Sequence, residues 1–336
     1  MITASPAARL SPAAPDWREL WRDAITDAGE LLQVLGLAHL SDRLPPGDAG
    51  FALRVPRGFV ARMRPGDPRD PLLLQVLPQL AELDRVPGFS ADAVGDLASL
   101  EARGVLHKYQ GRALLIASGS CAVNCRYCFR RHFPYGDGIA AAGQWRQALA
   151  HLHSDPTISE LILSGGDPLA LSNSKLEELG RGLAELPHVT RLRIHTRLPV
   201  VLPERVDAAF LAWFDALPLQ KVVVLHANHA NEFNPAVDAA CAALRQAGAT
   251  LLNQSVLLRG INDDTATLAA LSERLFATGV LPYYLHQLDR VQGAAHFEVD
   301  DARALALVEG MRGRLPGYLV PRLVREVAGD ASKRPL

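Results

Sequence analysis

Cysteine is scarce in this chain of 336 residues, which contains only four. A chain of this length buries enough apolar surface to fold without cross-links, and so few cysteines argue against a disulfide-stabilised secreted domain. Three of the four, Cys121, Cys125 and Cys128, lie close together in Cys-Ala-Val-Asn-Cys-Arg-Tyr-Cys, while Cys241 is far along the chain. The clustered three therefore indicate a metal site rather than a disulfide framework.

The chain also lacks a surplus of charge and a long apolar run. Its 35 lysine and arginine residues against 36 aspartate and glutamate residues leave a formal net charge of −1. This balance does not favour a nucleic-acid-binding protein. No apolar stretch reaches the roughly 20 residues that span a bilayer. The first fifteen residues lack the basic-then-apolar order of a signal peptide. We expect a cytoplasmic protein with no nucleic-acid or membrane partner.

Short apolar runs alternate with amphipathic stretches after residue 112. The runs, expected to be strands, are Ala113–Ala117, Leu161–Leu163, Leu192–Ile194, Val222–Leu225, Leu251–Val256 and Leu281–Leu285. The expected helices lie near residues 142–153, 174–186, 204–216, 235–247 and 264–278. This alternation predicts an α/β fold with a parallel sheet. Six units fall short of eight, so we expect a partial (β/α)6 TIM-like barrel, with a doubly wound open sheet as the alternative.

The N-terminal region has a different pattern. Apolar residues from Asp16 to Gly36 recur at helical spacing, and many prolines divide the chain that follows. We expect three parts: a helical N-terminal region at 1–104, the barrel at 105–316, and a C-terminal segment at 317–336. Residues Gly317–Pro321 are expected to form a strand within the last part.

Polar residues follow the expected strands. The groups are the cysteine loop, Ser164–Asp167, His195–Arg197, His226–His229, Asn253–Ser255 and His286–Asp289. In a barrel the carboxyl ends of the strands meet at one rim, so these groups predict a single site there.

The cysteine loop supplies three thiolates where most sites need four ligands. A closed structural zinc site or an ordinary iron–sulfur cluster has four protein ligands. Three thiolates on a cubane leave one iron open to another ligand. His132 could instead complete a Cys₃His zinc site, so spacing alone leaves both interpretations open.

Longer motifs bear a family resemblance. The spacing Cys-x₃-Cys-x₂-Cys, with an aromatic residue before the third cysteine, resembles the radical S-adenosylmethionine (SAM) signature. Four stretches resemble lysine 2,3-aminomutase: Cys128–Phe133, Ser164–Leu169, Asn253–Gly260 and Pro282–Tyr284. Three more are similar to a branch that makes (R)-β-lysine for attachment to translation elongation factor P: Phe51–Pro56, Leu106–Tyr109 and Gln292–Phe297.

This resemblance implies an isomerase that converts L-lysine to (R)-β-lysine with a [4Fe–4S] cluster, SAM and pyridoxal 5′-phosphate (PLP). It assigns the cluster to Cys121, Cys125 and Cys128, and SAM contacts to Gly165, Gly166, Asp167, His226 and Gln254. PLP would be held by Lys108, Tyr109, Arg112 and Lys333. Lys333 would carry PLP covalently as the catalytic lysine, which requires the C-terminal segment to fold back over the barrel mouth.

The resemblance also implies the substrate contacts and partners. Arg130 would bind the carboxylate of L-lysine, and Asp289 and Glu326 its ε-ammonium, although the family has aspartate where this chain has Glu326. The implied partners are a flavodoxin-type electron donor, elongation factor P and its lysyl ligase. The alternatives are a zinc-stabilised binding module of the same pathway without catalysis, a PLP enzyme without radical chemistry, and an aminomutase for another amino acid.

Overall fold

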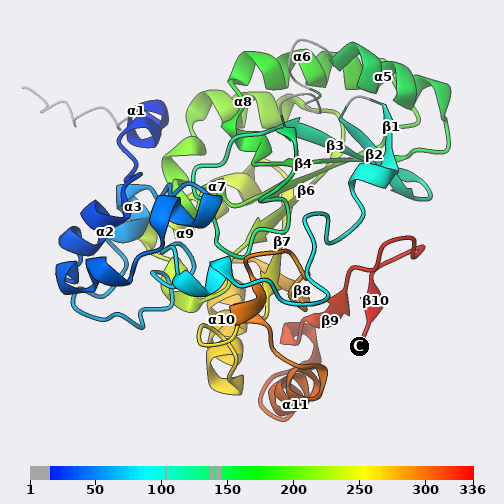
Figure 1. The fold of residues 1–336 in the computed structure, drawn as a ribbon. Helices are drawn as coiled ribbons and strands as arrows, with labels where there is room; N and C mark the ends of the chain where they lie inside the picture. The colour runs from blue at the N-terminus through cyan, green and yellow to red at the C-terminus, as the bar shows by residue number, and fades with distance from the viewer. Residues whose placement is uncertain (1–15, 103, 136–139, 141–144) are drawn as a thin grey trace, which may run out of the picture.

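The computed structural model describes residues 16–102, 104–135, 140 and 145–336. Within them, ten strands form one sheet in sequence order (Figure 1). The strands are β1 (Leu100–Ala102), β2 (Val105–Tyr109), β3 (Arg112–Ser118), β4 (Glu160–Gly165), β5 (Arg191–Thr196), β6 (Gln220–His226), β7 (Ala249–Val256), β8 (Leu281–His286), β9 (Arg322–Arg325) and β10 (Arg334–Pro335). Strands β3 to β9 are parallel, whereas β1, β2 and β10 pair antiparallel at the two edges.

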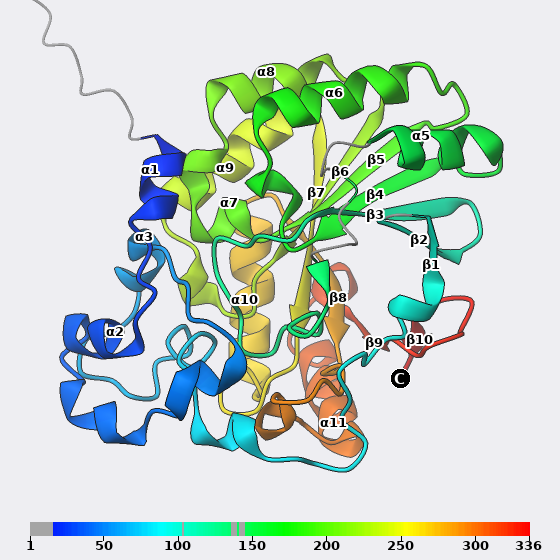
Figure 2. The same ribbon diagram turned by 45° about the horizontal axis from the view of Figure 1, so that its top comes forward.

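Helices connect the parallel strands and cover the outer face of the sheet (Figure 2). They are α5 (Trp145–Ser154), α6 (Asn173–Ala184), α7 (Leu198–Val201), α8 (Ala208–Ala216), α9 (Pro235–Gln246), α10 (Thr265–Ala277) and α11 (Asp301–Arg312). Ser172, Asp207, Asn234, Asp264 and Asp300 each cap a helix by accepting a backbone N–H. Such caps satisfy donors that have no partner within the helix.

The sequence-predicted barrel is confirmed. All six expected runs lie in β3 to β8, and the expected helices correspond to α5, α6, α8, α9 and α10. Residues 142–144 of the first expected helix lie outside the described residues. The stretch expected as one helix at 204–216 is a short 3₁₀ turn at Pro203–Arg205 followed by α8.

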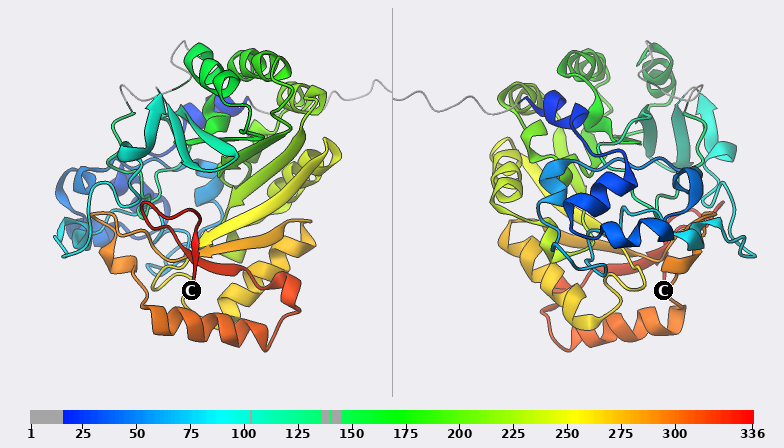
Figure 3. Two further views of the ribbon diagram at one scale, coloured as in Figure 1. Left: turned by 90° about the vertical axis from the view of Figure 1, so that its right-hand side faces the viewer. Right: turned by 60° about the vertical axis from the view of Figure 1, so that its left-hand side comes forward.

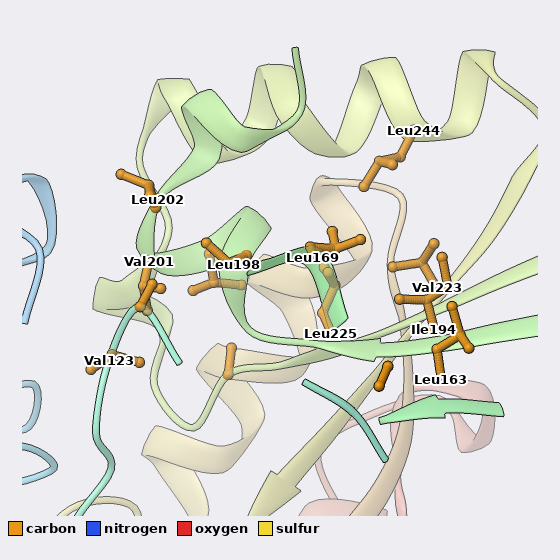
Figure 4. Close-up of a cluster of buried hydrophobic side chains, with 14 of the residues drawn as sticks. Val123, Leu163, Leu169, Ile194, Leu198, Val201, Leu202, Val223, Leu225 and Leu244 are labelled. Carbon is orange, nitrogen blue, oxygen red and sulfur yellow. The ribbon is translucent and has the colours of Figure 1, made fainter. Parts of the chain in front are cut away.

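Alternation of side chains along each strand separates the core from the interior of the barrel. In β5, Leu192 and Ile194 are buried toward the helices, while Arg193 and His195 line a cavity on the inner face. Successive residues of a strand point to opposite faces, so one strand serves both purposes. Figure 4 shows part of the core, where Leu163, Ile194, Val223 and Leu225 gather beneath α7 and α9 with Leu198, Val201 and Leu244.

The N-terminal region is less helical than predicted. The stretch Asp16–Gly36 forms two short helices, α1 (Trp17–Arg22) and α2 (Ala28–Val34), capped by Asp16 and Asp27. Ile25, between them, pairs instead with Val55 in an isolated β-bridge. The rest contains α3 (Arg57–Val60) and 3₁₀ turns at Ala38–Arg43, Pro46–Gly50, Leu80–Leu83 and Leu97–Ser99, joined by irregular segments. This region lies across the barrel in the right-hand view of Figure 3.

The C-terminal segment also differs in one element. The strand expected at Gly317–Pro321 is wrong: Gly317–Leu319 form a 3₁₀ turn, and β9 begins after Pro321. A proline has no N–H for a ladder, which places it before a strand rather than within one. After β9 the chain turns and returns as β10, which pairs Arg334 with Arg325.

None of the helices described combines the length and apolar character that a bilayer crossing requires.

Candidate active site

A cavity of about 530 Å³ runs along the inner face of the sheet. All of the sequence-predicted site residues line it: Lys108, Tyr109, Arg112, Cys121, Cys125, Cys128, Arg130, Gly165, Gly166, Asp167, His226, Gln254, Asp289, Glu326 and Lys333. These residues come from seven strands or the loops that follow them, as well as from the C-terminal turn. The volume is within the usual range for a small-molecule site, roughly 300–1,000 Å³.

The N-terminal region holds the cysteine loop in place. The backbone N–H of Asn124 donates to the Arg54 carbonyl at 3.0 Å, and its side-chain amide donates to Ala52 at 2.9 Å. The N–H of Arg126 donates to the Gln75 carbonyl at 2.9 Å. A loop without regular structure needs such partners when it is buried.

A buried carboxylate strengthens this attachment. Glu82 accepts from Arg126 through two bonds of 2.8 and 2.5 Å, and from Arg131 at 2.8 Å. The side chains of Glu82 and Arg126 have no exposed surface. Removing one partner of a buried ion pair strands the other charge and costs about 3–5 kcal/mol. The residues flanking Cys125 and Cys128 are therefore firmly tied to the turn at Leu80–Leu83.

Arg197, which follows β5, contacts the cysteine loop directly. Its Nη1 donates to the Cys125 Sγ at 2.6 Å and to the Tyr127 hydroxyl at 2.5 Å. Its Nη2 donates to Gln75 at 2.7 Å and to Glu232 at 3.0 Å. One guanidinium thus joins the N-terminal region, the cysteine loop and the strand-end rim.

The thiols of the loop are buried. Burial raises the pKa of Cys128 to about 11, and burial followed by the charges of Cys128 and Asp167 raises the pKa of Cys121 well above its usual value. Ligation by a metal requires thiolates and would therefore release protons. Within the described ranges, no three His, Cys, Asp or Glu side chains are arranged around one metal-ion position. The His132 Nε2 lies 3.1 Å from the Gln292 carbonyl.

Two glycines bring the end of β4 against the start of the cysteine loop. A Cβ on Gly165, whose φ is +121°, would lie 2.5 Å from the Ser118 carbonyl oxygen, and one on Gly166 would lie 2.6 Å from that of Ser120. Real Cβ atoms do not approach so closely, so both positions need glycine. The N–H of Gly166 donates to Ser118 at 2.6 Å.

The Asp167 carboxylate forms its hydrogen bonds with groups of the protein itself. It accepts from the Thr196 hydroxyl and from the backbone N–H groups of Leu169, Arg197 and Leu198, at 2.7–3.0 Å. Burial raises the pKa of Asp167 to about 6 against these stabilising bonds. The side chain therefore fixes the turn after β4 to the turn after β5.

His226 and Gln254 lie opposite the cysteine loop, at the ends of β6 and β7. The His226 Nε2 is 3.0 Å from the Tyr127 hydroxyl, and the two rings stack with centroids 5.7 Å apart. Burial lowers the pKa of His226 to about 3, so its imidazole is neutral. The Tyr127 hydroxyl connects this histidine to Arg197.

A chain of charges runs from the cysteine loop to β2. Arg130 donates from Nε to the Asp96 Oδ2 at 2.7 Å and from Nη1 to the Ser164 hydroxyl at 2.9 Å. The Lys108 Nζ lies 2.6 Å from the other oxygen of Asp96 and 3.8 Å from Glu326. Burial raises the pKa of Asp96, but Arg130 and Lys108 outweigh it, so the net pKa is lowered.

Glu326 and Lys333 face each other across the β9–β10 turn and form an ion pair. The Tyr109 hydroxyl donates to the other oxygen of Glu326 at 2.6 Å. Burial raises the pKa of Glu326, but the neighbouring Lys333, Tyr109 and Lys108 outweigh burial, so the net pKa is below its usual value. Arg112 lies over the Tyr109 ring, 4.7 Å from its centroid.

Asp289, His195 and His286 complete the interior. Burial raises the pKa of Asp289 to about 7, although Lys333 opposes this shift. Burial also lowers the pKa of His195 and of His286 well below the usual value. Among the described protein atoms, the buried Nε2 of each of these histidines has no hydrogen-bond partner. The inner wall therefore offers both a carboxyl group and neutral imidazoles to a ligand.

Several residues of the site were not singled out from the sequence. Asp96 and Glu82 lie in the irregular N-terminal region, where no periodicity marks a buried acid. Arg197 was noted only as one of the polar residues after a strand, and Glu232 follows the next strand within a short turn. Glu82 and Glu232 also accept backbone N–H groups within their own short turns. The charged partners that bring the four residues into the site lie between 34 and 122 positions away, so no local pattern signals that role.

The chain is similar over almost its whole length to named relatives. It is 48% identical over 329 residues to the L-lysine 2,3-aminomutase of Escherichia coli, covering 97% of this chain and 96% of that protein. It is 44% identical to the Haemophilus influenzae protein of the same name, covering 97% and 98%, and 32% identical to that of Clostridium subterminale, covering 96% and 77%.

Other comparisons are more distant. A solved radical SAM methyltransferase from Sphaerobacter thermophilus covers 66% of this chain and 68% of its own, with 17% identity and a TM-score of 0.46. No protein-family model matches the chain. The near full-length relatives confirm the family predicted from the motifs: the chain belongs to the L-lysine 2,3-aminomutase family of isomerases.

Proposed function

We propose that this chain is a radical SAM, PLP-dependent enzyme that converts L-lysine to (R)-β-lysine for the modification of elongation factor P. The observation that carries the proposal is that one cavity contains three thiols, a glycine turn and a lysine paired with a carboxylate. The family membership supports the reaction, and the similarity of Phe51–Pro56, Leu106–Tyr109 and Gln292–Phe297 to one branch supports the pathway.

The donor sets suit the three proposed cofactors. Three soft thiol ligands on one loop fit an iron–sulfur cluster with an open iron. The turn at Gly165 and Gly166 packs directly against the start of that loop and lines the same cavity, where the SAM contacts are proposed. Lys333 and Arg112 offer an amine and a guanidinium, which suit the aldehyde and the phosphate of PLP. When bound, the cluster and SAM would supply the hydrogen-abstracting radical, and PLP would stabilise the substrate radical during migration of the amino group.

The protein side chains would orient the substrate. Arg130 is held by Asp96 and Ser164 through Nε and Nη1, and we assign it the substrate carboxylate. The ion pair of Lys333 with Glu326 suggests that the two amines use one carboxylate in turn. Glu326 would release Lys333 when that residue takes up PLP, and would then accept the ε-ammonium of the substrate together with Asp289.

The partners follow from this proposal. A low-potential donor such as a flavodoxin would supply electrons to the cluster. Elongation factor P and its lysyl ligase would use the product, which places the enzyme in the cytoplasm. We also keep the division into parts at 1–104, 105–316 and 317–336 as a proposal, with one amendment: β1 lies before residue 105 yet belongs to the barrel sheet.

The test is anaerobic turnover of L-lysine with SAM, PLP and dithionite, with chromatography that resolves α-lysine from β-lysine. We expect (R)-β-lysine, and no product when SAM is omitted. Product from another amino acid in preference to lysine would reassign the substrate. Zinc in place of iron in anaerobically purified protein, with no turnover, would instead favour a binding module.

Replacing Asp289 by asparagine should raise the KM for L-lysine by at least about 30-fold, because losing one partner of a buried charged contact costs about 2–5 kcal/mol. Iron and PLP contents should be unchanged. Asp238→Asn is the matched control, since Asp238 pairs with Arg274 on the outer surface, where ion pairs contribute little. An unchanged KM in Asp289→Asn would show that the substrate ammonium is bound elsewhere.

The same carboxyl group should make substrate binding depend on pH. The pKa of Asp289 is raised to about 7, and only its ionised form attracts an ammonium. The KM for L-lysine should therefore fall as the pH rises through 7 and increase again as the pH is lowered. Asp289→Asn should flatten this dependence. A wild-type KM that is constant between pH 6 and about 8 would contradict the assignment.

A further inference from the structure

Arg197 aims one N–H group at a cysteine sulfur. The distance from Nη1 to the Cys125 Sγ is 2.6 Å, and the Arg197 side chain is only 7% exposed. Arg197 follows β5 directly and occupies the N-cap position of α7, so its backbone lies between two regular elements. The contact is therefore a built feature of the rim rather than a chance approach of a surface arginine.

The opposite side of the guanidinium is also held. Its Nη2 donates to Gln75 and to Glu232, and the Glu232 side chain is fully buried. The other oxygen of Glu232 accepts the backbone N–H groups of Asn228 and His229 at 2.7 and 3.1 Å. Because the guanidinium is planar, fixing Nη2 also fixes the direction of Nη1.

We propose that Arg197 is a positioning residue that sets the reduction potential of the cluster through its hydrogen bond to Cys125. This rests on the proposed function, in which the Cys125 thiolate binds one iron. Reduction transfers one electron from an external low-potential donor to [4Fe–4S]²⁺ and gives [4Fe–4S]⁺, with no bond broken in the protein. The substrate takes no part in this electron transfer.

The direction of the effect follows from the charge. Reduction adds one negative charge to the cluster, and a fixed cation beside a ligand sulfur stabilises that state more than the oxidised one. Burial of the contact limits screening by water. The compensating Glu232 binds the other nitrogen, farther along the guanidinium from the sulfur. Arg197 therefore raises the reduction potential and makes the cluster easier to reduce.

The experiment is an anaerobic redox titration of reconstituted, full-length protein, followed by the electron paramagnetic resonance of [4Fe–4S]⁺. In Arg197→Gln, the ratio of reduced to oxidised cluster at a fixed solution potential should fall by about tenfold, which is a shift of about 59 mV for one electron. Arg197→Lys keeps the positive charge but lacks the two Nη donors of the guanidinium, so its reduction potential should lie between those of the wild type and Arg197→Gln. Arg205→Lys is the control, because Arg205 is also buried but donates to the Leu169 and Leu171 carbonyls.

The outcomes separate this inference from the proposed function. Wild-type protein that binds no iron–sulfur cluster would overturn the function itself. Wild-type and Arg197→Gln clusters with full iron and equal potentials would overturn only the role of Arg197, as would an equal shift in Arg205→Lys. If Arg197→Gln does not retain its iron, the potential of Arg197→Lys decides, and a value equal to that of the wild type would overturn the inference.

Discussion

A Cys128→Ala protein should bind no [4Fe–4S] cluster and should lose turnover of L-lysine by more than about 100-fold, the upper end of what the loss of an outer-shell group costs. Three thiolates are the proposed protein ligands of the four irons. Removing one thiolate therefore leaves two irons without a protein ligand. Iron and sulfide assays after anaerobic reconstitution, together with the broad visible absorption of the cluster, measure the result.

Cys241→Ala provides the matched control. Cys241 is fully buried on α9, on the helical side of the barrel, and burial raises the pKa of its thiol to about 12. Its replacement should preserve the iron content. Iron lost from Cys241→Ala but retained in Cys128→Ala would refute the ligand assignment, as would zinc in the wild-type loop.

The second large effect is expected at Lys333. Lys333→Ala should hold no PLP covalently, and turnover should fall by more than about 100-fold, since a positioned proton-transfer group alone contributes that much. Borohydride reduction of the wild-type protein followed by peptide mapping should place the pyridoxyl label on Lys333. The amine lies within the cavity beside Glu326, as this chemistry demands.

The lysine content makes this test decisive, because the chain has only four lysines. Lys108 is in the same cavity but donates to the Val94 carbonyl at 2.8 Å and pairs with Asp96. Lys221 donates to the Phe214 and Asp215 carbonyls, so Lys221→Arg should keep its PLP. A label on Lys108, Lys175 or Lys221, with turnover retained in Lys333→Ala, would contradict the assignment.

Regular patterns made the barrel predictable from the sequence. Each of the runs in β3 to β8 is apolar on the side that meets the helices. Packing against the helices requires this, and the resulting pattern can be recognised within each run by itself. The strands β1, β2, β9 and β10 were not predicted. β1 and β10 are very short antiparallel strands at the two edges of the sheet, and β9 has only four residues, so these strands carry too little alternation to be recognised.

The contacts within the site were harder to predict than its residues. The motifs identified Arg130, Glu326 and Lys333, but nothing local indicates that Arg130 is held by Asp96 or that Glu326 accepts from Tyr109. These bonds join segments 34 and 217 positions apart. They depend on how the N-terminal and C-terminal segments pack on the barrel, which only the folded chain determines.

The pairing of Lys333 with Glu326 should also protect the protein before it acquires PLP. Cells contain many reactive carbonyl compounds, such as sugars and metabolic aldehydes, that attack free amines. An ammonium group held by a carboxylate presents no lone pair to them. If Lys333 carries PLP as proposed, an aldehyde must first break this ion pair, and contacts with the rest of the cavity would favour PLP over aldehydes that lack them.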